Sequence, residues 1–131
     1  MMETTGTAPW IGAWLVQGSA VKANSTFPAL MTFTSDGIVF ADEAPEPLES
    51  SGHGSWEQTG PNEAAYTFVF LIGNTDRSNW MQATVSGDLQ YIGDDDRWIG
   101  PFTFRQADRE GNEVAADTGL MSGARIRARE R

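Results

Sequence analysis

The stretch LMTFTSDGIVFA (residues 30–41) contains two short apolar runs joined by Asp36-Gly37. Glycine adopts the positive φ that tight turns need, so an Asp-Gly pair between two such runs is a strong signal for a β-hairpin. Both runs are rich in aromatic and β-branched residues, which favour strands. The stretch therefore predicts an antiparallel hairpin formed by Pro28–Thr34 and Ile38–Ala41.

The same pattern recurs along the chain. Helical periodicity is nearly absent, and short aromatic and β-branched runs alternate with clusters of Gly, Asp and Asn. Gly87-Asp88 predicts a second tight turn, and Val114–Asp117 is either a further short strand or part of a loop. The predicted strands are Trp10–Gln17, Pro28–Thr34, Ile38–Ala41, Gly54–Gln58, Ala65–Ile72, Trp80–Ser86, Leu89–Ile92, Trp98–Gln106 and Gly123–Arg129.

Successive hairpins form a meander, and a meander of about eight or more strands tends to close because closure removes its edges. We therefore predict an all-β protein, an antiparallel meander closed into a β-barrel of about eight or nine strands. An open sandwich is the structural alternative. Residues 1–131 are expected to form a single domain with residues 1–9 as a flexible leader, and DEAPEPLESSG (residues 42–52) is expected to form a mobile loop or lid.

Composition excludes several classes of function. Nine basic residues against eighteen acidic ones give a net charge of −9, which disfavours binding to nucleic acid or to anionic membranes. Cysteine is absent, so disulfides and thiolate chemistry are excluded. The segment MMETTGTAP (residues 1–9) lacks the features of an export signal, and we expect a cytoplasmic monomer or homodimer.

Motifs for catalysis or cofactor binding are also missing. His53 is the one histidine, so a Ser-His-Asp triad would depend on it, and the G-x-S-x-G elbow is absent. His/Cys metal sites, phosphate loops and dinucleotide fingerprints are absent too. Because glycines flank His53, its ring could reach a ligand as a hydrogen-bond partner, a general base or a haem ligand, although a plain loop histidine is the commoner case. We expect no cofactor.

Alternation along the predicted strands points to a lumen. Tyr66, Phe68 and Phe70 share one face of their strand, and Trp98, Phe102 and Phe104 share one face of another. A tightly packed core is the alternative for any one of these residues. The predicted ligand contacts are His53, Trp56, Tyr66, Phe68, Phe70, Trp80, Gln82, Tyr91, Trp98, Phe102 and Phe104.

The first strand carries Gly12-Ala13-Trp14, which resembles the G-x-W signature of the lipocalins within the calycin superfamily. In that family the tryptophan closes the bottom of the barrel and a late arginine packs across the indole. The chain ends in GARIRARER (residues 123–131), so the resemblance implies that Arg125 or Arg127 covers Trp14 and that Gly12 permits close approach. A second lipocalin motif of the T-D-Y kind, a disulfide and a helix after the last strand are missing.

The resemblance implies that the predicted barrel is calycin-like, or lipocalin-like, and that it binds a small hydrophobic molecule in its apolar lumen. The alternative is a cofactor-free cyclase or isomerase like the small barrels of the allene-oxide-cyclase or spirotetronate-cyclase type. Such enzymes need confinement and orientation of the reacting ends rather than a metal or a triad. The absence of a catalytic motif therefore does not separate these two hypotheses.

Overall fold

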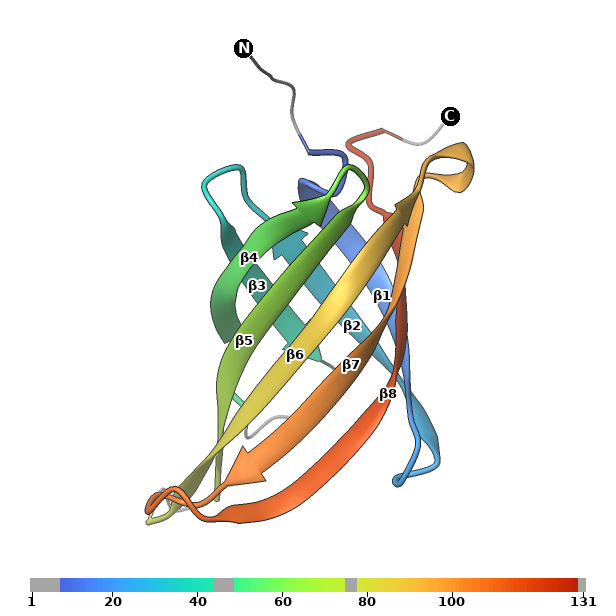
Figure 1. The fold of residues 1–131 in the computed structure, drawn as a ribbon. Coiled ribbons are helices and arrows are strands. Elements are labelled where there is room, and N and C mark those ends of the chain that lie inside the picture. Colours follow the sequence, from blue (N-terminus) through green and yellow to red (C-terminus); the bar gives the residue numbers. More distant parts are fainter. Residues whose placement is uncertain (1–7, 44–48, 75–77, 130–131) are drawn as a thin grey trace.

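The computed structural model describes residues 8–43, 49–74 and 78–129, and these residues form a closed antiparallel β-barrel (Figure 1). The predicted all-β meander is confirmed, and the alternative of an open sandwich is wrong. Neighbours in sequence are neighbours in the sheet, and β1 pairs with β8 to close the barrel. The strands are β1 (Gly12–Ala20), β2 (Ser25–Phe33), β3 (Ile38–Glu43), β4 (Gly52–Gly60), β5 (Glu63–Gly73), β6 (Trp80–Ile92), β7 (Arg97–Ala107) and β8 (Glu113–Arg125).

The hairpin predicted from Asp36-Gly37 joins β2 to β3. Gly37 has a φ of 93°, in the region that favours glycine, and Thr32 pairs with Phe40 across the hairpin. A 3-10 turn at Gly93–Asp95 links β6 to β7 and ends at Asp96, which has a φ of 51°. These turns lie at the end of the barrel where β1 begins and β8 ends (Figure 1).

The turn predicted at Gly87-Asp88 is wrong, because β6 runs through it without a break. Gly87 lies opposite Tyr66 of β5, and a Cβ on Gly87 would come within 2.4 Å of the Tyr66 hydroxyl oxygen. Glycine is needed at this position because its missing side chain makes room for the inward-facing Tyr66 ring, and not because a turn requires a positive φ. The two strands predicted on either side are therefore one strand.

The predicted ends of the last strand are also wrong. β8 begins at Glu113, so Val114–Asp117 belongs to it, and it stops at Arg125. Arg127 and Arg129 follow the strand and do not share a strand face with Arg125. The predicted loop or lid at residues 42–52 includes residues 44–48, which lie outside the described residues, as does most of the predicted leader.

Large inward-facing rings pack against glycines on neighbouring strands of the barrel. Trp98 is paired in register with Gly123, and a Cβ there would lie 2.4 Å from the indole nitrogen. The same arrangement recurs three more times around the barrel, in the register pairs Gly18–Phe27, Tyr66–Gly87 and Phe102–Gly119. Alternating large and small residues lets adjacent strands share the interior volume, as in small closed barrels.

Candidate ligand-binding cavity

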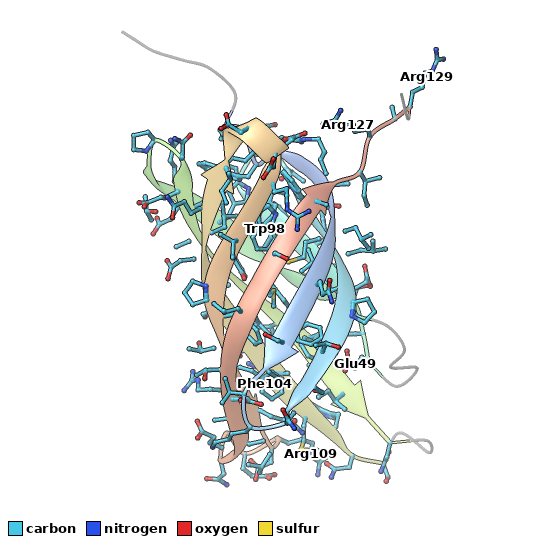
Figure 2. The ribbon with its side chains drawn as sticks, turned by 90° about the vertical axis from the view of Figure 1, so that its right-hand side faces the viewer. Glu49, Trp98, Phe104, Arg109, Arg127 and Arg129 are labelled. Atoms are coloured by element: carbon cyan, nitrogen blue, oxygen red, sulfur yellow. The ribbon has the colours of Figure 1, made fainter. Side chains whose placement is uncertain are left out.

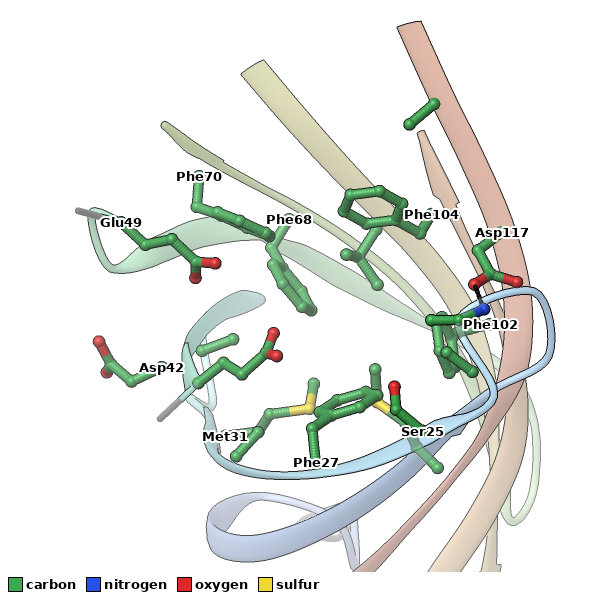
Figure 3. A pocket seen from close by; sticks show the side chains of 18 of the residues that line it. Ser25, Phe27, Met31, Asp42, Glu49, Phe68, Phe70, Phe102, Phe104 and Asp117 are labelled. Carbon is green, nitrogen blue, oxygen red and sulfur yellow. Dashed lines mark hydrogen bonds between the residues drawn. The ribbon is translucent and has the colours of Figure 1, made fainter. Parts of the chain in front are cut away.

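The barrel is filled at one end and hollow at the other. A cavity of about 510 Å³ is lined by residues of the β1–β2 turn, of the end of β3 and of the inner faces of the strands. Figure 1 shows that the β1–β2 turn and the end of β3 lie at the end of the barrel opposite the β2–β3 turn, and Figure 3 shows the side chains around the cavity. This volume is within the range of small-molecule sites in proteins. The interior walls come from β2, β3, β5, β6, β7 and β8 and are apolar, comprising Phe27, Ala29, Met31, Ala41, Phe68, Phe70, Val85, Phe102, Phe104 and Met121.

The polar lining residues cluster at the mouth. The charged side chains among the described lining residues are those of Lys22, Asp42, Glu43, Glu49 and Asp117. Asp117 fixes the β1–β2 turn against β8, since its carboxylate accepts hydrogen bonds from the backbone N–H groups of Lys22 (2.8 Å) and Ala23 (3.0 Å). These bonds and one from the Thr118 N–H lower the pKa of Asp117, so it is an anion at neutral pH.

Four of the predicted ligand contacts line this cavity: Phe68 and Phe70 from β5, and Phe102 and Phe104 from β7. Figure 3 shows their rings around the same space. They come together because residues two apart in a strand share a face and because both strands turn that face inward.

Four other predicted contacts face the interior without lining the cavity. Tyr66 and Trp98 lie between the cavity and the filled end, with ring centroids 6.4 Å apart. The Tyr66 hydroxyl contacts the Met121 sulfur at 3.6 Å, and burial raises the Tyr66 pKa well above its ordinary value. Trp56 and Tyr91 belong to the filled end: the Trp56 indole donates to the Thr34 carbonyl oxygen, and the Tyr91 hydroxyl donates to Asp96.

The remaining three predicted contacts lie on the outer face, so their predicted placement in the lumen is wrong. Trp80 is 42% exposed and precedes the inward-facing Met81, while Gln82 is exposed. The prediction chose the bulkier side of this strand, but the closed barrel turns the side with Ala83 and Val85 inward. His53 is exposed and packs edge-on against Phe40 outside the barrel, at 5.3 Å between centroids.

The cavity also has apolar walls that the sequence interpretation missed. Phe27, Ala29 and Met31 alternate along β2 and face the cavity, while Met121 does so from β8. The alternation in STFPALMTF (residues 25–33) was a usable signal, but the predicted strand began only at Pro28 and so excluded Phe27. Met121 was missed because the predicted last strand began at Gly123.

Trp14 and Arg125 close the other end. The Arg125 guanidinium carbon lies 4.4 Å from the centroid of the fully buried Trp14 ring, a cation–π geometry. Arg125 also donates to both carboxylate oxygens of Asp96 and to the carbonyl oxygen of Ile11, at 2.9 Å. Gly12, with a φ of 128°, leaves space for this arginine, since a Cβ there would lie 2.8 Å from its Nη1. Arg127 does not cover the indole.

The Asp96 carboxylate makes the stability of this closure depend on pH. Hydrogen bonds from Arg125 hold the Asp96 pKa below its ordinary value, and the Tyr91 hydroxyl adds to the effect. The stabilisation is therefore present above the unfolded-state pKa of about 4 and is lost as pH falls through the lower folded-state pKa. Asp96→Asn should lower the free energy of unfolding at pH 7 by about 1–3 kcal/mol. In denaturant titrations its difference from wild type should shrink toward pH 3, and a constant difference would contradict this role.

The walls of the cavity offer apolar contact and confinement to a guest. Among residues 8–43, 49–74 and 78–129, no group of His, Cys, Asp or Glu is arranged to hold a metal ion. None of the helices in those residues is long and apolar enough to cross a bilayer. Comparisons with protein-family models, curated proteins and solved structures find no match.

Proposed function

We propose that this protein binds a small apolar molecule inside a calycin-like barrel. The observation that carries the proposal is the contrast between the two ends: one end buries the rings of Trp10, Trp14 and Trp98 completely, and the other holds an apolar cavity of about 510 Å³. Core packing alone does not require such a space, since protein interiors are normally close-packed.

The energetics favour an apolar guest. Burial of apolar surface contributes roughly 25 cal/mol per Å², and the cavity walls supply aromatic, aliphatic and thioether groups as contacts. Met31 and Met121 are flexible enough to adapt to more than one shape. Shape and apolarity discriminate weakly among related molecules, so we expect several similar guests to bind.

The calycin-like assignment within this proposal is supported by the closed end. Arg125 packs across the Trp14 ring and Gly12 leaves space for it, which is the arrangement that the G-x-W resemblance implies. The strands that carry these residues belong to an eight-stranded meander. A cofactor-free cyclase would use the same cavity, but no lining residue gives that alternative separate support. We propose a cytoplasmic binding protein that acts without nucleic acid or membrane.

A neutral environment-sensitive dye tests the proposal. N-phenyl-1-naphthylamine should bind the native protein saturably, near one per chain, with energy transfer from tryptophan. Ala41→Phe places a ring into the cavity and should weaken dye binding about tenfold or more, equivalent to about 1.4 kcal/mol. Leu30→Phe is the matched control, because Leu30 is 50% exposed on the outer face of the adjacent β2.

The folded state of both variants is checked by their thermal unfolding. Dye fluorescence that rises only on partial unfolding would exclude a binding cavity in the native protein. Equal dye affinity for Ala41→Phe and Leu30→Phe would place the dye outside the barrel.

A further inference from the structure

We infer that the guest carries an aromatic ring, and that this ring lies in a slot between Phe68 of β5 and Phe104 of β7, above Val85 of β6. This inference rests on the proposed function. It assigns the chemical class of the ligand and distinguishes aromatic molecules from saturated rings and alkyl chains of similar size.

The slot follows from the pairing of three neighbouring strands. Val85 lies opposite Phe68 in the β5–β6 register and opposite Phe104 in the β6–β7 register, so the three residues form one row across the inner wall of the cavity. Neighbouring strands lie about 4.7–4.9 Å apart, which places the backbones of β5 and β7 roughly 10 Å apart at this row. Because valine is smaller than the phenylalanines on either side of it, the row is low in the middle and high at both edges.

The two phenylalanine rings do not contact each other across the slot. Phe68 packs against Tyr66 and Phe70 of its own strand, with ring centroids 6.1 and 6.5 Å away. Phe104 is partly buried and makes no ring-to-ring contact within the part of the chain that the structure describes.

A guest ring therefore supplies the aromatic partner that Phe104 lacks. Placed midway between β5 and β7, it would lie about 5 Å from each phenylalanine, inside the range of about 4.5–7 Å in which aromatic pairs attract. A saturated ring in the same place fills the space but has no π-system, so it gains the apolar burial without the aromatic contacts.

The other walls of the cavity also favour an aromatic guest. Figure 3 shows Phe27 and Met31 of β2 across the space from Phe104, and Met121 of β8 lines the same cavity. Thioether sulfurs make favourable contacts with aromatic rings, often at the ring edge. Among the described lining residues Val85 is the one branched aliphatic side chain, and leucine and isoleucine are missing. The walls thus offer ring and sulfur contacts in place of the branched aliphatic contacts of an ordinary core.

Two uncharged probes with the same carbon skeleton test the inference: 2-naphthol and its saturated analogue decahydro-2-naphthol, both at pH 7. Burial of apolar surface alone does not favour the aromatic probe, because saturation adds hydrogens and removes no carbon. Contacts of its rings with both sides of the slot add to that burial. Calorimetry should therefore give about fivefold or tighter binding for 2-naphthol.

Phe104→Leu locates the effect. Leucine keeps an apolar side chain at this position and removes the ring, so the ratio of the two dissociation constants should fall about threefold or more while decahydro-2-naphthol binds nearly as it does to wild type. The matched control Phe40→Leu removes the same ring from the outer face of β3, where Phe40 is 39% exposed, and it should keep the wild-type ratio. Thermal unfolding of both variants shows that they are folded.

The outcomes separate the inference from the proposed function. Equal affinity of the wild type for the two probes, tighter binding of the saturated probe, or the same ratio in Phe104→Leu and Phe40→Leu would overturn the aromatic slot while leaving a binding cavity. Binding of the neutral dye but of neither probe would also exclude the slot. Failure of both probes and of the neutral dye to bind would overturn the proposed function itself.

Discussion

Trp14→Ala should lower the free energy of unfolding by about 3–5 kcal/mol, the usual cost of emptying a buried tryptophan site. The Trp14 side chain is fully buried, donates its indole N–H to the Trp10 carbonyl oxygen at 2.8 Å and lies under Arg125. Alanine would leave that carbonyl without its donor and the guanidinium without the ring it covers. Denaturant unfolding followed by circular dichroism measures the loss.

Leu15→Ala provides the control for this experiment. Leu15 follows Trp14 in the same strand but is 55% exposed, so the change should cost less than about 1 kcal/mol. A loss below 1 kcal/mol for Trp14→Ala, roughly the effect of a surface substitution, would show that Trp14 does not close the barrel. The proposal that the barrel is calycin-like would then lose its main support.

The architecture was predictable from the sequence because the meander depends on local signals. Turn residues such as Asp36-Gly37 and alternation within residues 65–72 each act over a few positions, and barrel closure follows from the number of strands. The error at Gly87 has a non-local cause. Glycine there accommodates the ring of Tyr66, a residue of another strand, and sequence alone does not distinguish such a glycine from a turn glycine.

The site was less predictable for two reasons. It depends on which face of each strand turns inward, and it depends on where along the barrel axis each inward-facing residue lies. In β5 and β7 the bulky face is the inner face, so Phe68, Phe70, Phe102 and Phe104 were identified correctly as lumen residues. In β6 the bulky Trp80 lies outside, because the inner face of that strand is the one that carries Ala83 and Val85. The position along the barrel axis then decides which inward-facing residues line the cavity. Trp98 faces inward but packs in the filled end and does not line the cavity.

Trp98→Ala is expected to have an effect on stability as large as that of Trp14→Ala, about 3–5 kcal/mol. Trp98 is fully buried and contacts Trp14, Phe33 and Tyr66 edge to face, with centroids 6.4, 6.2 and 6.4 Å away. Within the described residues its indole nitrogen has no hydrogen-bond partner, and an unpaired buried donor costs about 1–3 kcal/mol. Trp98→Phe keeps a ring and removes that donor, so it should cost much less than Trp98→Ala.

Trp80→Ala is the matched control, because it removes the same side chain from the outer face of β6, where Trp80 is 42% exposed. It should change the free energy of unfolding by less than about 1 kcal/mol, since a half-exposed ring loses little on truncation. The two variants compare the stability lost when the same side chain is removed from the inner face of β7 and from the outer face of the neighbouring β6. Equal losses for Trp98→Ala and Trp80→Ala, both followed by denaturant unfolding, would mean that the inner face of β6 or β7 is assigned wrongly, and with it the wall of the cavity.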